Sequence, residues 1–105
     1  MSPIGYEVTL VVQDGIAGEY EAWLHAHVAQ MLALPGFLGA TVSRVLEPAP
    51  APGETAFCCL YTLRDQAALD EYLRVHAAGM RADGVARFGD RFRASRRVLG
   101  VVATY

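Results

Sequence analysis

Two histidines, His27 and His76, hold the positions best suited to chemistry in this sequence. Each follows an aromatic residue by four positions, Trp23 before His27 and Tyr72 before His76. At about 100° per residue, that spacing places each imidazole on the apolar face of a predicted helix. If both helices cover the same side of a sheet, the two rings reach one cavity as acid–base groups or ligand donors. The alternative is a pair of core histidines, each hydrogen-bonded to a carbonyl or a tyrosine.

Metal, nucleotide and nucleophile sites are not expected. His25 falls on the opposite helix face from His27, and the sequence contains no HExxH, GxGxxG or GxSxG motif. Cys58 and Cys59 are adjacent, so in a strand they point to opposite faces and a disulfide between them would be strained. Cysteines in a strand are more often inert core residues than nucleophiles. We therefore expect no metal and no cofactor.

Arginines gather in the C-terminal half of the chain. The sequence contains no lysine, and residues 55–105 hold eight of its nine arginines. One interpretation is a solvated surface whose arginines pair with acids of the other half or of a second subunit. The other is an anion site for a carboxylate or phosphate, since Arg96 and Arg97 lie on opposite faces of a strand and one must enter a covered face. The gathered arginines are Arg81, Arg87, Arg91, Arg93, Arg96 and Arg97.

Alternation and helical spacing indicate the elements that must position these side chains. Strands are predicted at residues 6–13, 37–47, 55–63 and 92–103, where Val, Leu, Thr and aromatic residues are frequent. Helices are predicted at residues 17–34, ending at Pro35-Gly36, and from Arg64-Asp65 toward Phe88, with Asp65 as N-cap. The segment from Pro48 to Gly53 is a loop between two strands.

The apolar stripes of the two predicted helices indicate what each buries. Gly79 and Gly84 are expected to kink or split the second helix. The stripe of the first helix comprises Tyr20, Trp23, Leu24, Met31 and Leu34, and that of the second Leu69, Tyr72, Leu73 and Met80, extended by Val85 and Phe88.

The order strand, helix, strand, strand, helix, strand predicts a ferredoxin-like α+β fold. Right-handed crossovers then give a four-stranded antiparallel sheet with both helices on one face. The length of 105 residues fits one domain, residues 1–105. The strands are apolar on both faces, because Val11 alternates with Val8, Leu10 and Val12. A sheet face open to water should be polar, so we expect a second copy to cover it as a homodimer.

Composition limits the kinds of molecule with which the protein is expected to interact. The chain is 53% hydrophobic and 19% charged with a net charge of −2, which suggests more buried surface than a small monomer offers. A net acidic chain without an aromatic–basic RNP-like strand does not favour nucleic acid. The longest apolar stretch is interrupted by His25, His27, Gln30 and Pro35, so we expect no membrane span. No signal peptide is evident, and we expect a cytoplasmic protein.

Two segments resemble a known family. They are WLHAHVAQMLALPGF, residues 23–37, and YLRVHAAGMRADGVARFGDRFRASRRVL, residues 72–99. Both resemble a family of small bacterial proteins classed as a domain of unknown function, and the second is the more specific. Val28-Ala29 and Ala78 depart from the family, which tends to have Ile-Pro and Pro there. The residues that match are His27, His76, Arg81, Phe88, Gly89, Asp90, Arg91, Arg96 and Arg97.

The resemblance implies dimeric α+β barrel topology. That broader group includes cofactor-free quinone monooxygenases, haem-degrading oxygenases and stress-response proteins, with a pocket between helices and sheet in each subunit. Fold analogy of this kind carries little weight for function.

Two hypotheses follow for function. The first is a homodimeric protein that binds a small hydrophobic or aromatic anion, as a binding domain or as a cofactor-free monooxygenase-like enzyme in which a histidine removes a phenolic proton. The second is a structural or interaction domain without a pocket. Under the first hypothesis the expected ligand-binding residues are Trp23, His27, Tyr72, His76, Phe88, Arg91 and Arg96.

Overall fold

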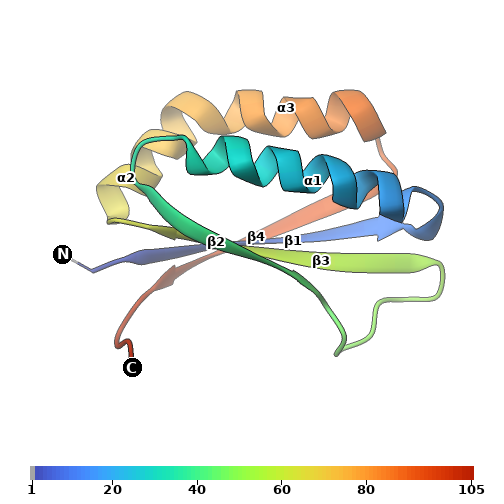
Figure 1. Ribbon diagram of the computed structural model, residues 1–105, viewed down its shortest axis with the longest axis horizontal. Coiled ribbons are helices and arrows are strands. Elements are labelled where there is room, and N and C mark those ends of the chain that lie inside the picture. The colour runs from blue at the N-terminus through green and yellow to red at the C-terminus, as the bar shows by residue number, and fades with distance from the viewer. Residues whose placement is uncertain (1) are drawn as a thin grey trace.

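A computed structural model describes residues 2–105 as a helical layer packed on one face of an antiparallel sheet (Figure 1). The four strands follow the order β2-β3-β1-β4, so the first and third strands in sequence form the centre. The predicted ferredoxin-like α+β topology is confirmed. The strands are β1 (Ile4–Gln13), β2 (Phe37–Arg44), β3 (Glu54–Leu63) and β4 (Phe92–Gly100).

The helical layer contains α1 and one long helix that is divided in two. A short 3-10 turn, η1 (Asp14–Ile16), leads into α1 (Ala17–Leu32). The second helix comprises α2 (Gln66–Glu71), the π-helical turn η2 (Tyr72–His76) and α3 (Ala77–Phe88). Both α1 and α3 lie above the same face of the sheet in Figure 1, as the sequence predicted.

The π-helical turn corrects one expectation about the second helix. Gly79 and Gly84 do not kink or split it, because both lie inside the uninterrupted helix α3. The division lies upstream, where the Ala77 amide donates to the carbonyl of Tyr72, five residues back. A π turn holds one more residue than an α turn and therefore rotates everything that follows it. Gly84 instead permits close packing, because a Cβ there would lie 3.1 Å from Cη2 of Trp23 on α1.

Several boundaries differ from the prediction by a few residues. β2 ends at Arg44 and β4 at Gly100, each three residues before the predicted end. α1 ends at Leu32 because the last turn tightens, with the Leu34 amide donating to the Met31 carbonyl. Gly36 then adopts φ 84°, where a Cβ would overlap that of Ala68. A glycine is therefore required for the chain to enter β2.

The core lies between the helices and the sheet. Ile4, Tyr6, Val8, Leu10 and Val12 alternate along β1 and are buried against the helices. Tyr20, Leu24 and Met31 of the predicted stripe on α1 are buried, and Trp23 and Leu34 are partly buried. Of the predicted stripe on the second helix, Leu69, Tyr72 and Phe88 are buried and Met80 is partly buried, whereas Leu73 and Val85 are exposed.

None of the helices within residues 2–105 is both long enough and apolar enough to cross a membrane.

Asp65 caps α2, as the sequence predicted. Its Oδ1 accepts a hydrogen bond of 2.9 Å from the Ala68 amide, and the residue is buried. We expect Asp65→Ala to lower the free energy of unfolding by about 1–2 kcal/mol, measured by urea denaturation. Asp70→Ala removes an exposed acid of the same helix and should change that energy by less than about 0.5 kcal/mol. Equal losses in both variants would contradict a capping role.

Candidate functional site

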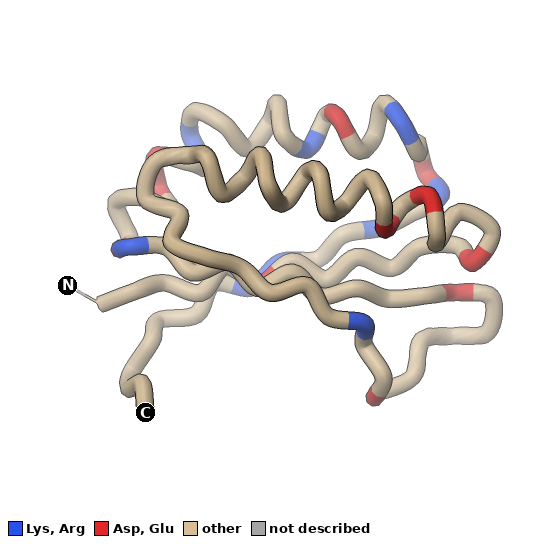
Figure 2. Tube along the Cα trace, viewed as in Figure 1, with Lys and Arg blue, Asp and Glu red and all other residues tan. Residues whose placement is uncertain are grey.

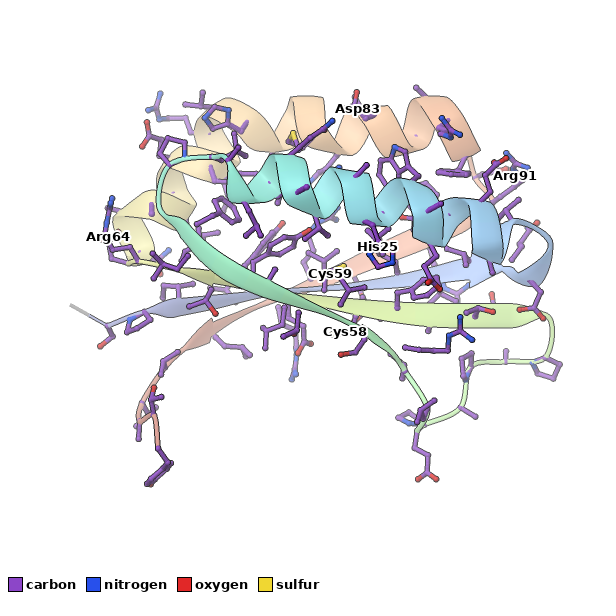
Figure 3. All side chains as sticks on the ribbon, in the orientation of Figure 1. His25, Cys58, Cys59, Arg64, Asp83 and Arg91 are labelled. Atoms are coloured by element: carbon purple, nitrogen blue, oxygen red, sulfur yellow. The ribbon has the colours of Figure 1, made fainter. Side chains whose placement is uncertain are left out.

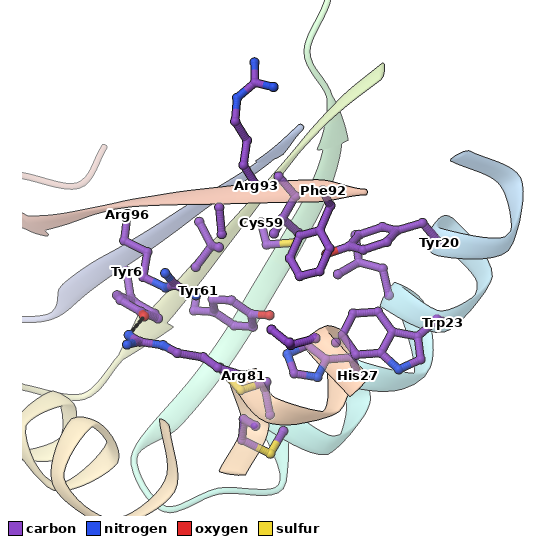
Figure 4. Close-up of a pocket in the computed structure, with 18 of the residues that line it drawn as sticks. Tyr6, Tyr20, Trp23, His27, Cys59, Tyr61, Arg81, Phe92, Arg93 and Arg96 are labelled. Carbon is purple, nitrogen blue, oxygen red and sulfur yellow. Dashed lines mark hydrogen bonds between the residues drawn. The ribbon is translucent and has the colours of Figure 1, made fainter. Parts of the chain in front are cut away.

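A cavity of about 350 Å³ lies between the helical layer and the sheet (Figure 4). Its walls are mainly aromatic and aliphatic, and its exposed lining residues Arg81 and Val85 of α3 and Arg96 of β4 mark the opening. The aromatic wall consists of Tyr6, Tyr20, Trp23, Tyr61, Tyr72 and Phe92, and the aliphatic and sulfur-bearing wall of Val8, Leu10, Leu24, Met31, Cys59, Met80, Val85 and Ala94.

Strand alternation and register build the floor of this cavity. On β1, Val8 is paired with Cys59 of β3 on one side and with Arg96 of β4 on the other. Side chains directly opposite one another in a sheet share a face, so Arg96 stands on the helix side. The neighbouring pair Glu7 and Arg97 stands on the outer side, where the two side chains form a salt bridge of 2.8 Å. The expectation that Arg96 and Arg97 part across the sheet is therefore confirmed.

Four of the seven residues proposed from the sequence line this cavity. They are Trp23 and His27 on α1, Tyr72 at the π turn and Arg96 on β4. His76, Phe88 and Arg91 are absent from its lining. The structure therefore does not bring the two imidazoles into one cavity.

His76 is displaced by the π turn. In a regular α-helix, a residue four positions after Tyr72 would lie on the same face. The extra residue in the turn shifts that role to Ala77, five positions after Tyr72, and Ala77 is buried beside the core. His76 is only partly buried. The even helical spacing assumed from the sequence does not hold at this turn.

Phe88 and Arg91 have other surroundings. Phe88 is 1% exposed and packs behind the cavity wall, with ring centroids 4.8 Å from Tyr20 and 5.7 Å from Trp23. Arg91 donates from Nε to the Phe88 carbonyl at 3.1 Å and borders a separate, smaller hollow beside Gln13. Figure 3 shows Arg91 near the far end of α3, at the turn into β4.

His27 is the one histidine on the cavity wall. Its ring stacks on Trp23, with centroids 4.7 Å apart and planes 20° apart. Its Nδ1 atom is buried without a hydrogen-bond partner among the described residues. Burial lowers the pKa of His27, and the carboxylate of Asp83 on α3 offsets that only in part. A neutral imidazole therefore faces the cavity at neutral pH. His25, as expected, is exposed on the other side of α1.

Two arginines face the cavity without an acidic partner. Arg81 donates from Nη2 to the Tyr6 hydroxyl at 3.0 Å, and neither Arg81 nor Arg96 has a carboxylate within 4.0 Å among the residues described. By contrast, Arg93 at the rim of the cavity and Arg97 on the outer face are paired with Glu54 and Glu7. In Figure 2 the charged positions of α1 are all acids, whereas α3 carries arginines and one acid, Asp83, and β4 carries arginines. The cavity is therefore positive at its mouth.

Sequence reasoning missed three of the four tyrosines on the cavity wall. Tyr6, Tyr20 and Tyr61 were not proposed as ligand-binding residues, and Arg81 appeared only among the gathered arginines and the family matches. Alternation along strands 6–13 and 55–63 puts Tyr6 and Tyr61 on the helix face, which was a usable signal. That Arg81 meets Tyr6, 75 residues away, could not be read from local spacing.

The tyrosines and cysteines of the wall are held protonated. Burial raises the pKa of Tyr20 and Tyr61, and it raises the pKa of Tyr72 to about 12 despite Arg81 and Arg96 nearby. Burial also raises the pKa of Cys59 to about 11. Cys59 lies on the helix side of the sheet and Cys58 on the outer side (Figure 3), and both are free thiols. A protonated thiol is a poor nucleophile, which agrees with inert cysteines.

No cluster of three or more His, Cys, Asp or Glu side chains that could hold a metal ion exists within residues 2–105.

Solved structures with the same arrangement define the class of the fold. SnoaB, a cofactor-independent oxygenase from Streptomyces nogalater, superposes with a TM-score of 0.70 at 14% identity, covering 99% of this chain and 97% of its own. A protein of unknown function from Nitrosomonas europaea gives 0.73 at 14%, covering 100% and 94%. A protein from Pseudomonas aeruginosa gives 0.70 at 20%, covering 98% and 97%. The chain has the ferredoxin-like fold of the dimeric α+β barrel proteins.

The sequence then identifies the family. Residues 3–102 match the model of the family described as "Domain of unknown function (DUF4286)", and the chain belongs to that family. The resemblance seen in the two histidine- and arginine-bearing segments is thereby confirmed. No protein of curated function matches the sequence.

Proposed function

We propose that this protein is a homodimer that binds a small hydrophobic or aromatic anion in the cavity between helices and sheet. The observation that carries the proposal is an apolar cavity of about 350 Å³ with two unpaired guanidinium groups and no acidic lining residue among those described. Small-molecule sites are typically apolar hollows of this order of size with a few convergent polar groups.

The aromatic wall supports a ring-bearing ligand. Tyr20 lies at the centre of a ring cluster, with centroids 5.3 Å from Phe92, 5.4 Å from Trp23 and 4.8 Å from Phe88. Such rings present faces and edges that pack well against a further ring. Phe88 lies behind this wall and supports it instead of touching the ligand.

The arginines support a negative charge on that ligand. Arg81 and Arg96 both act on the Tyr72 hydroxyl, which places two like charges near one group. Figure 4 shows both side chains on the same side of the cavity, and His27 with Trp23 on the other. An anion between the two guanidinium groups would relieve their repulsion and make charge-assisted hydrogen bonds.

A homodimer through the outer sheet face forms part of the proposal. Dimeric α+β barrel proteins share this fold, which leaves one sheet face without helices. On that face Leu60 and Leu99 flank Gly5, where a Cβ would lie 3.5 and 3.4 Å from their side chains. This apolar strip, formed by Leu60, Gly5 and Leu99, crosses β3, β1 and β4 and is suited to burial against a second copy.

A cofactor-free monooxygenase is the second candidate. It is favoured by the fold shared with a cofactor-independent oxygenase and by a neutral imidazole on an apolar cavity wall. Oxygen uptake on mixing the purified protein with aromatic hydroxy acids, without any added cofactor, distinguishes an enzyme from a binding protein.

Two fluorescent probes test the anion site. We expect 8-anilinonaphthalene-1-sulfonate to bind, and Arg81→Gln and Arg96→Gln each to weaken it about tenfold or more, as for a lost charged hydrogen bond. N-phenyl-1-naphthylamine has the same rings without the sulfonate, so both variants should bind it as the native protein does. Fluorescence titration gives both affinities.

Arg87→Gln is the matched control on α3. Its guanidinium lies over the Phe88 ring, 5.8 Å from the centroid, and it is absent from the cavity lining. The sulfonate probe should bind this variant with unchanged affinity. Failure of both probes to bind the native protein, or equal weakening by all three substitutions, would refute the proposed site.

A further inference from the structure

The polar groups on the cavity wall are predominantly hydrogen-bond donors. Arg81 and Arg96 are donors only, and no Asp, Glu, Asn or Gln lines the cavity in the described part of the chain. Tyr72 keeps its proton because burial raises its pKa to about 12, so its hydroxyl can donate as well. Hydroxyls also accept, but the Tyr6 oxygen already accepts from Arg81. On the opposite wall, the position of the proton on His27 determines whether the ring offers a ligand a hydrogen-bond donor or an acceptor.

The two ring nitrogens of His27 are not equivalent. Nδ1 is the nitrogen that is buried without a partner. Nε2 is not among the buried atoms without a partner, and it forms no hydrogen bond with the described residues. Nε2 is therefore the atom left to meet a molecule in the cavity. Stacking on Trp23 holds the ring plane, so rotation of the ring about its Cβ–Cγ bond would require the ring to leave this contact.

The proton of the neutral ring belongs on Nε2. A neutral imidazole carries one N–H, and placing it on Nδ1 would bury a donor without an acceptor. Buried donors without a partner are rarer in proteins than acceptors with a free lone pair. With the proton on Nε2, Nδ1 keeps only a lone pair in the protein interior. His27 then presents a donor to the cavity.

We propose that the cavity selects an aromatic ligand with acceptors at both ends, a carboxylate held by Arg81 and Arg96 and a carbonyl oxygen that accepts from Nε2 of His27. This inference rests on the proposed anion-binding function and names its substrate class, an aryl ketone acid. His27 is a specificity-determining residue in this assignment. A phenolic hydroxyl at the same place would put its O–H donor against the N–H donor of Nε2, unless the hydroxyl rotated so that its oxygen accepted from Nε2.

A pair of matched acids tests the assignment. 4-Benzoylbenzoate and 4-benzylbenzoate share two rings and a carboxylate and differ only in a carbonyl or a methylene between the rings. By isothermal titration calorimetry we expect the ketone to bind the native protein about tenfold more tightly or better, because the methylene compound would cover the Nε2 donor without giving it an acceptor. His27→Phe should abolish that preference while the methylene compound keeps its affinity.

His25→Phe is the matched control, because His25 lies on the same helix but is exposed outside the cavity. This variant should retain the full preference for the ketone. Equal binding of both acids by the native protein would overturn the carbonyl assignment and leave the anion site standing. Binding of neither acid would count against the proposed function itself and, with it, against this inference.

The protonated nitrogen can also be observed without any ligand. Two-bond ¹⁵N–¹H correlation spectra of the labelled native protein distinguish a protonated from an unprotonated ring nitrogen, with His27→Phe used to assign the signal. We expect His27 to show Nε2 protonated and Nδ1 bare at neutral pH. A proton on Nδ1 would overturn the assignment, because Nε2 would then accept from a ligand hydroxyl.

Discussion

Phe88→Ala is expected to lower the free energy of unfolding by about 3–5 kcal/mol, as for a large aromatic side chain removed from a core. Phe88 is 1% exposed and contacts the rings of Tyr20 and Trp23. Its loss leaves a void between α1 and α3 behind the cavity wall. Domains of this kind are stable by only about 5–15 kcal/mol, so this one change removes a large share. Urea denaturation at fixed protein concentration measures the loss.

Two further variants keep this prediction decisive. Phe88→Leu retains most of the volume and should cost about 1–2 kcal/mol, so it stays folded if the alanine variant does not. Val85→Ala truncates an apolar side chain of the same helix that is 58% exposed, and it should cost less than about 0.5 kcal/mol. A cost below about 1 kcal/mol for Phe88→Ala would contradict the assignment of Phe88 to the core.

Leu60→Glu is expected to convert the proposed dimer into a monomer. Leu60 belongs to the apolar strip on the outer sheet face, and its register partner on β1 is Glu7. A glutamate there would add a carboxylate beside the Glu7–Arg97 pair and bury it, without a partner of its own, against the other copy. Burial of an unpaired charge at an interface costs several kcal/mol, so the dissociation constant should rise by about three orders of magnitude or more. Sedimentation equilibrium gives that constant.

The control for this change lies in the helical layer, on the other side of the sheet. Val75 in η2 is 50% exposed, so Val75→Glu adds the same charge away from the proposed interface and should stay dimeric. Thr62→Glu places an exposed charge elsewhere on the outer face and should weaken the dimer without disturbing the core. A native protein that is monomeric at high micromolar concentration, or a Leu60→Glu variant that stays dimeric, would contradict sheet-to-sheet pairing.

Much of the fold could be predicted from the sequence because its signals are local. Alternation separated the row of Val8, Leu10 and Val12 on β1 from Val11, and helical spacing predicted Tyr20, Leu24 and Met31 as buried residues on α1. The order of elements then restricts the topology, since right-handed crossovers leave few arrangements. Asp65 could be predicted as a helix cap from its position directly before an apolar run, and its capping hydrogen bond is present.

The lining of the cavity was predicted only in part. Trp23 and His27 lie on its wall, as their spacing indicated, because α1 is regular and spacing and direction agree along its length. His76 was misplaced because a single π turn changes the rotation of every later residue, and nothing in the spacing around Tyr72 reveals it. Phe88 was correctly placed on an inward face, but it packs in the core behind the cavity and does not line the cavity itself. Arg91 was placed at a ligand, although its Nε is engaged by the Phe88 carbonyl.

The sequence by itself determined the types and order of the elements and the family to which the chain belongs, since these depend on residues close together in the chain. Tertiary structure decided which polar groups find partners. Arg97 on β4 forms a salt bridge with Glu7 on the neighbouring β1, and Arg81 donates a hydrogen bond to Tyr6. Arg96 has no salt-bridge partner and Nδ1 of His27 no hydrogen-bond partner among the described residues. Pairing between residues tens of positions apart depends on strand register and helix packing. Here that pairing distinguishes the charged groups that form salt bridges from those that remain available to a ligand.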